Sequence, residues 1–269
     1  MSVDQNFLAP IMSNPENVYY LGPNAYGKPA AALNILRETI MGKELFDFAF
    51  KTYSQRWMFK HPTPEDFFRT MEDASAVDLD WFWRGWFYTT DYVDIGIKEV
   101  NQYFVSPEPG EEMLEIMRDQ GIPRNRLRPL IFFDKYENNK SDFKDKSPLD
   151  NSKLLGNYLK ENYSQEEINT IDIPKYYYEI IFDKPGGLVM PIIIDIKYDD
   201  GETVRKRYPA QVWRKNDKEV KKIITSNKKI EEIVLDPEKE TADIDERNNS
   251  WPKKEDQTDF DKFKSNVKG

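Results

Sequence analysis

The sequence contains no cysteine, and its 269 residues include a single histidine, His61. Without cysteine the chain cannot form disulfides or use a thiol as a catalytic nucleophile. Zinc sites need several nitrogen, sulfur or carboxylate ligands around one ion, and His61 has neither a second histidine nor a cysteine to join it. We therefore expect no metal ligands, and in particular no tight zinc site, in this chain.

Basic residues and long apolar runs are also scarce. The 39 lysines and arginines are outnumbered by 48 acids, for a formal net charge of −9, which disfavours nucleic acid as a partner because phosphate binding needs a basic surface. The longest apolar run, 188–194, falls far short of the roughly 18 to 20 residues of a membrane helix, so we expect no membrane span. The opening residues are polar and predict no signal peptide in this chain. A periplasmic or secreted location for the complete protein stays open, because the absence of cysteine fits either side of a bacterial inner membrane.

What the sequence does have is aromatic residues, at 14%, together with 32% charged residues. The aromatic share indicates well-packed folded modules, and the charges indicate a strongly solvated surface. The length suffices for about two ordinary domains, each with its own core.

Residues 1–94 have the pattern of a helical bundle. Pro29 suits the first turn of a helix whose apolar residues recur at helical spacing as far as Gly42, a plausible stop. A second helix carries the apolar pattern Leu45, Phe48, Ala49 and Tyr53. Two further helices are expected, one opened by a capping box at 63–66 and one near Asp78. On the last of these helices, Leu79, Phe82, Trp83 and Trp86 form one apolar stripe.

The remaining sequence changes character twice. From Ile95 to Val105 the period shifts towards that of a strand, and the rest of 95–174 is a polar insert or spacer with short helices near 111–119 and 152–161. Residues 175–252 alternate in the manner of strands, with hairpin turns expected at 200–201, 216–217 and 226–227. Within them, Tyr176, Tyr178, Ile180 and Phe182 share one face, as do Ile192, Ile194, Ile196 and Tyr198.

We expect Asp236-Pro237 to end a strand, and several short strands at this spacing predict an antiparallel β-sandwich of immunoglobulin type. Residues 253–269 are a charged tail. The expected fold is therefore α+β and multidomain, a helical bundle followed by a β-sandwich.

The segment 24–42 carries the most functional information. Tyr26 stands just ahead of the expected helix start and is followed by Lys28, Pro29 and a run of small residues. Further on, 63–68 (Thr-Pro-Glu-Asp-Phe-Phe) and 80–86 (Asp-Trp-Phe-Trp-Arg-Gly-Trp) follow in order. This succession resembles the C-terminal segment of the aminopeptidase N-like zinc metallopeptidases (gluzincins of peptidase family M one), most closely those of Bacteroidetes-type bacteria.

The resemblance covers 20–105 and 175–252, and it has functional implications. In that family two histidines of an H-E-x-x-H motif and a later glutamate hold zinc, and a tyrosine donates its phenol O–H to the oxyanion of the tetrahedral intermediate. Tyr26 matches that tyrosine, and Lys28 matches a residue of the substrate cleft. The helices would be the second half of the catalytic domain, and Val234-Leu235-Asp236-Pro237 would be the closing strand of the sandwich that follows it.

The sequence departs from the family pattern in three places. Pro29 replaces the commoner glycine, and 88–94 lacks the glycine and proline that many relatives have after the tryptophan helix. The H-E-x-x-H motif is absent, so zinc, its ligands and the general base would belong to a missing N-terminal catalytic part. We expect the chain by itself to be inactive, with no cofactor of its own and with peptides as substrates of the complete enzyme.

Each site residue also has a plainer interpretation. Tyr26 could simply pack at a helix start, and Lys28 could be a solvated charge. The tryptophans could form a platform for sugars, but their helical spacing favours a core. Asp78 and Asp80 could be a glycosidase pair, although neighbouring acids on a helix point to different faces. Basic residues at 205–207 could bind an anion or form a solvated strand face.

Two functional hypotheses follow. The chain is either the C-terminal part of a zinc aminopeptidase or a non-catalytic module that binds a peptide or protein partner. The surface of residues 1–50 separates the two hypotheses. A part that normally lies under a missing half should expose a large apolar patch around the Tyr26 helix, whereas a self-sufficient module should be polar there.

Overall fold

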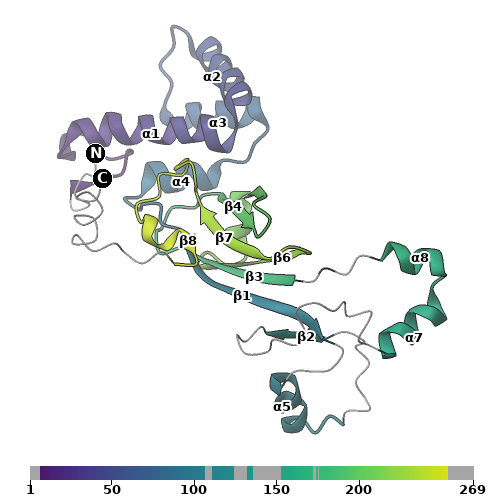
Figure 1. Ribbon diagram of the computed structural model, residues 1–269. Helices are drawn as coiled ribbons and strands as arrows, with labels where there is room; N and C mark the ends of the chain where they lie inside the picture. The colour runs from purple at the N-terminus through teal and green to yellow at the C-terminus, as the bar shows by residue number, and fades with distance from the viewer. Residues whose placement is uncertain are drawn as a thin grey trace, which may run out of the picture.

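The computed structural model describes residues 7–106, 111–123, 132–135, 153–171, 174 and 176–253. It combines helices with two antiparallel sheets (Figure 1). The expected α+β class is confirmed. None of the described helices has the length and apolar character needed to cross a membrane.

The first long helix is built from three consecutive segments. A π-helical turn, η3 (Gly22–Gly27), continues into α1 (Lys28–Ile35) and a second π-helical turn, η4 (Leu36–Ile40). The helix ends before Gly42, whose φ of +82° is a conformation that glycine adopts at little cost. Tyr26 therefore lies inside the helix and not just ahead of its start, as we had expected, because the wide turn extends the helix towards the N-terminus.

Three more helices complete this part of the chain: α2 (Lys43–Trp57), α3 (Pro64–Ser75) and α4 (Asp80–Tyr88). The capping box of α3 forms as predicted, with the Thr63 amide donating to Asp66 Oδ2 at 3.0 Å. The prediction that Phe48 belongs to the apolar face of α2 is wrong, since its side chain is 59% exposed. Ala49 is buried as predicted, and Phe46, which the predicted pattern left out, is buried in place of Phe48.

The first sheet has the strand order β2-β1-β3-β6. Its strands are β1 (Gly96–Ser106), β2 (Phe132–Lys135), β3 (Tyr176–Asp183) and β6 (Glu219–Ser226). The strand expected at 95–105 is thus present as β1. It pairs with β3 from Gly96, opposite Asp183, to Tyr103, opposite Tyr177.

The second sheet has the strand order β5-β4-β7-β8. Its strands are β4 (Ile192–Tyr198), β5 (Thr203–Tyr208), β7 (Ile230–Leu235) and β8 (Ser250–Trp251). The predicted hairpin at 200–201 joins β4 to β5, and β7 ends before Asp236 as expected. The other two predicted hairpins are wrong. The turn at 216–217 follows the 3-10 helix η7 (Ala210–Arg214), and the turn at 226–227 carries the chain from the first sheet into the second.

One hydrophobic core joins the helices to the sheets. The residues predicted to share one face of β3 and of β4 are buried in the same cluster as the aromatic stripe of α4, except Tyr176, which is partly buried against it. Gly85 of α4 lies so close to Leu188, in the loop before β4, that an added Cβ would come within 2.9 Å of the Leu188 side chain. The helical part and the sheets are therefore packed directly on each other.

The two short helices expected between β1 and β3 are present as α5 (Glu111–Asp119) and α7 (Lys153–Asn162), and α8 (Gln165–Thr170) follows them. They lie away from the helical part, beyond β1 and β2 (Figure 1). Much of the rest of the predicted insert, and nearly all of the predicted tail at 253–269, falls outside the described residues.

Replacing Gly186 by alanine should destabilise the fold. The new Cβ would lie 2.5 Å from the Tyr92 carbonyl oxygen and 2.6 Å from the Asp94 amide nitrogen, and both are backbone atoms that cannot turn aside. We expect a loss of about 1–3 kcal/mol in the free energy of unfolding, measured by urea denaturation. Gly156→Ala, in α7 with open space around it, is the matched control and should be neutral or stabilising. Equal stability of the two variants would contradict this packing.

Candidate functional site

Tyr26 projects from the first turns of the long helix and is 71% exposed. Its hydroxyl has no hydrogen-bond partner among the described residues. The phenol O–H is therefore available as a donor at the surface.

Asn24, two residues earlier, fixes the backbone around Tyr26. It is only 2% exposed, and its Oδ1 accepts from the Ala9 amide at 3.0 Å. Its Nδ2 donates to the carbonyl oxygens of Phe7, Tyr19 and Tyr20 at 3.1–3.3 Å. One amide side chain thus holds segment 7–20 against the start of the helix. Sequence reasoning missed this role, because nothing near Asn24 marks it as buried.

Lys28 fixes the same helix from another side. Its Nζ donates to the Thr89 carbonyl oxygen, at the end of α4, at 2.6 Å. A cation at a helix C-terminus also interacts favourably with the helix dipole. Burial lowers the pKa of Lys28, and the nearby Asp91 carboxylate partly offsets this effect. Lys28 therefore anchors α1 to α4. It is not a freely solvated charge, and its place in a substrate cleft stays a prediction.

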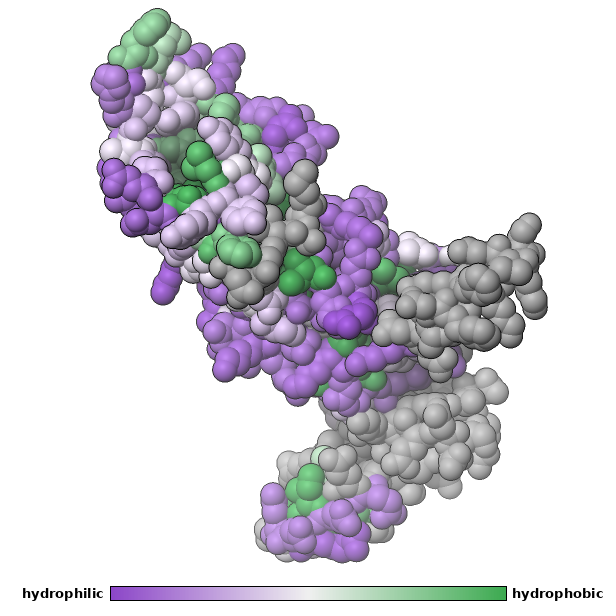
Figure 2. Space-filling view, turned by 90° about the vertical axis from the view of Figure 1, so that its left-hand side faces the viewer, coloured by the Kyte–Doolittle hydropathy of each residue, from purple (hydrophilic) through white to green (hydrophobic). Residues whose placement is uncertain are grey.

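Around Tyr26 lies a group of exposed large side chains that we call the aromatic surface. It consists of Phe7, Tyr19, Tyr20, Leu21 and Tyr26, all 45% exposed or more. Further exposed apolar side chains lie on α2 and just after it, namely Phe48, Phe50, Met58 and Phe59. Figure 2 shows apolar and near-neutral residues interspersed with hydrophilic ones over the helical part, above sheets whose surface is mostly hydrophilic. Contiguous exposed apolar patches often mark interaction sites.

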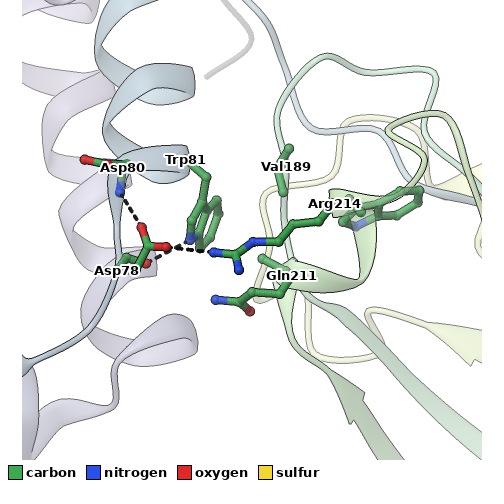
Figure 3. Close-up of a pocket in the computed structure, with 8 residues that line it drawn as sticks. Asp78, Asp80, Trp81, Val189, Gln211 and Arg214 are labelled. Carbon is green, nitrogen blue, oxygen red and sulfur yellow. Dashed lines mark hydrogen bonds and ion pairs between the residues drawn. The ribbon is translucent and has the colours of Figure 1, made fainter.

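A pocket of about 260 Å³ lies between α4 and η7 (Figure 3). Trp81 and Val189 form apolar walls, and the Arg214 guanidinium bonds Asp78 Oδ2 at 2.7 Å across one side. The carboxyl groups of Asp78 and Asp80 point apart in Figure 3. This geometry does not suit the paired carboxylates of a glycosidase, which must face each other across one bond.

The other candidate residues serve the fold. Trp83 and Trp86 are buried, which confirms that they belong to the core. Arg205 bonds the Asp195 carboxylate at 2.7 Å, and Arg207 bonds that of Glu240 at the same distance, so acids neutralise the basic strand β5. His61 is exposed ahead of α3.

Within the described ranges, no three or more histidine, cysteine, aspartate or glutamate side chains are grouped so as to hold a metal. No protein-family model matches the chain, and no curated protein is significantly similar to it.

Replacing Lys28 by methionine should destabilise the chain. The substitution keeps the aliphatic stem but removes the bond to the Thr89 carbonyl oxygen, at a cost of about 1–2 kcal/mol in the free energy of unfolding. Lys51→Met, on an exposed position of α2, should change this free energy by less than about 0.5 kcal/mol. Thermal and urea denaturation measure both variants. If Lys28→Met were no less stable than Lys51→Met, Lys28 would not anchor the helix.

Proposed function

We propose that this chain is the C-terminal part of a zinc-dependent aminopeptidase that removes residues from the free N-termini of peptides. The observation that carries the proposal is the aromatic surface around the helix of Tyr26. The peptidase hypothesis requires an apolar patch at this place, because the missing N-terminal catalytic part would cover it. A self-sufficient binding module would be expected to be polar here.

The proposal gives the two parts of the fold distinct roles. The helices up to residue 94 are the second half of a catalytic domain, and the two antiparallel sheets form an immunoglobulin-like sandwich behind it. The position of α1 to α4 ahead of β1 and the crossing of the chain from one sheet to the other at 226–227 support this assignment.

The described residues do not fit a zinc site. His61 is the chain's only histidine, and no suitable group of ligands surrounds it in the described ranges. The ligands, the metal and the general base would all come from the N-terminal part. This chain would contribute the wall of the substrate cleft and a hydrogen-bond donor.

In the proposed mechanism, the Tyr26 hydroxyl donates a hydrogen bond to the carbonyl oxygen of the peptide as that oxygen becomes negatively charged. The bond strengthens as the charge develops, so it stabilises the transition state more than the bound substrate. Asn24 and Lys28 support this role, because they fix the helix that bears the phenol at two separate points. A fixed donor needs no reorganisation during the reaction.

Tyr26→Phe in the complete enzyme tests the assignment. The variant should keep its zinc and its fold but lose about a hundred- to a thousand-fold in kcat, because one oxyanion donor is removed. Turnover of an aminoacyl substrate and metal content are measured together. Tyr19→Phe is the matched control, since Tyr19 is a still more exposed tyrosine of the same surface, and it should retain activity. Unchanged turnover in Tyr26→Phe would refute the role of Tyr26.

The chain by itself separates the peptidase from the binding module. We expect the purified chain to hydrolyse no aminoacyl substrate and to gain activity only when the N-terminal part is supplied. The reading frame upstream of the Met1 codon should encode H-E-x-x-H and a following glutamate. If neither that frame nor a neighbouring gene encodes them, the peptidase proposal falls, and the alternative is a binding module that kept the fold without the metal site.

A further inference from the structure

The turn that joins α2 to α3 carries the most exposed large apolar side chain of the described residues. Phe59 is 99% exposed there, and Met58 before it is 57% exposed. We call residues 57–60 the α2 tip. The tip lies at the end of the helical part away from the sheets, at the top of Figure 1. Figure 2 shows apolar residues at this end of the molecule, with hydrophilic residues beside them.

The backbone of the turn does not account for a phenylalanine at position 59. Phe59 has a φ of +59°, in the left-handed region that favours glycine and asparagine. The Lys60 amide donates to the Trp57 carbonyl oxygen at 2.9 Å and closes the turn around it. A large side chain raises the free energy of this conformation, so the turn by itself would select a smaller residue.

The core does not account for the apolar tip either. Trp57 points inward, and its indole N–H donates to Thr70 Oγ1 of α3 at 3.2 Å. Met58 and Phe59 are not part of the hydrophobic core of the described residues. Since neither side chain serves the turn or the core, both are available to bind something outside the chain.

The charge around the tip is opposite in sign to that of the whole chain. The chain has a formal net charge of −9, yet residues 48–64 contain no aspartate or glutamate. Three cations lie in this stretch, namely Lys51, Arg56 and Lys60, and the exposed His61 follows them. The tip is therefore apolar at its end and basic on its flanks.

Two of these cations are free to bind an anion. Arg56 is the exception, because it pairs with the Asp73 carboxylate at 3.4 Å. Among the described residues, Lys51 and Lys60 have no carboxylate partner. The Lys60 ammonium lies 5.8 Å from the centre of the Trp57 ring, at the base of the tip.

The outer side of α2 continues the same pattern. Phe48 is 59% exposed, and Lys51 stands three residues after it, so the two share one face of the helix. Exposed apolar and basic side chains thus alternate from the middle of α2 to the tip. Helices that lie at a membrane surface have this combination of apolar and basic residues.

We propose that the α2 tip binds the surface of an anionic lipid membrane. Met58 and Phe59 would enter the boundary between headgroups and acyl chains, and Lys51 and Lys60 would contact the lipid phosphates. The aliphatic part of a lysine can lie along apolar surface while its ammonium stays among the headgroups. A bilayer accepts a projecting apolar residue without a preformed pocket, whereas a protein partner would have to supply an apolar pocket with an acidic rim.

Two side chains bury little apolar area, so the binding would be reversible and would need the electrostatic attraction as well. The inference does not rest on the proposed peptidase function. Vesicle binding is measured without turnover, so the failure of one proposal would leave the other standing.

Co-sedimentation of the full chain with lipid vesicles tests the proposal. We expect binding to vesicles of phosphatidylcholine mixed with phosphatidylglycerol, weaker binding when salt screens the charges, and little binding to phosphatidylcholine alone. Lys60→Gln should weaken binding about fivefold, since one cation near the membrane surface is removed. Lys218→Gln, an equal charge change on an exposed lysine before β6, should bind as the unchanged chain does.

Phe59→Asn separates membrane binding from folding. Asparagine adopts the left-handed conformation readily, so the variant should have an unchanged or higher Tm. Its binding to the anionic vesicles should nevertheless fall at least about tenfold, because the inserted ring is lost. Ile223→Asn is the matched control, since Ile223 is 72% exposed on β6, and it should bind as the unchanged chain does.

The proposal is overturned if the unchanged chain does not bind the anionic vesicles, or binds phosphatidylcholine alone equally well. It is also overturned if Phe59→Asn binds as tightly as Ile223→Asn, because another surface would then contact the lipid. A lower Tm in Phe59→Asn would likewise refute it, since the ring would then serve the fold.

Discussion

Between the helices and the sheets lies the aromatic side of α4, where Phe82, Trp83 and Trp86 are buried. Trp83 stacks on Phe68 of α3 with ring centroids 4.6 Å apart, while Gly85, on the same helix, admits Leu188 from the loop before β4. Helix α4 therefore contacts both halves of the molecule. The long helix with Tyr26 depends on it as well, because the anchor of that helix is a carbonyl oxygen at the end of α4.

Local signals in the sequence predicted local structure well. The capping box of α3, the aromatic stripe of α4 and the turn between β4 and β5 each depend on neighbouring residues, and all three are present. The wrong predictions concern features that depend on tertiary contacts and not on residues adjacent in the sequence. The turn at 226–227 looks like that of a hairpin, but the partners of β6 and β7 lie far away in the chain and in different sheets. Phe48 and Phe46 suit the apolar face of α2 equally by type, and only tertiary packing selects Phe46.

The contacts that support the helix of Tyr26 and Lys28 were not predictable from the sequence. A sequence motif singled out Tyr26 and Lys28. The contacts that hold their helix reach Thr89, 61 residues beyond Lys28, and the backbone from Phe7 to Tyr20. The Asp94–Asn248 hydrogen bond joins residues 154 apart in the chain, and no periodic pattern in the sequence indicates it. Such pairings arise from the fold as a whole, so a single sequence cannot reveal them.

The hydrogen bonds of Asn24 also bear on the dynamics of the N-terminal segment. The buried side-chain amide of Asn24 forms hydrogen bonds with four backbone groups, those of Phe7, Ala9, Tyr19 and Tyr20. These contacts share one side chain, so the segment should open as one cooperative unit and not fray residue by residue. Phe7, Tyr19 and Tyr20 would then join the aromatic surface together or not at all. A partner that binds the aromatic surface would bind only the closed state of the segment. Part of the binding free energy would then be spent on closing it.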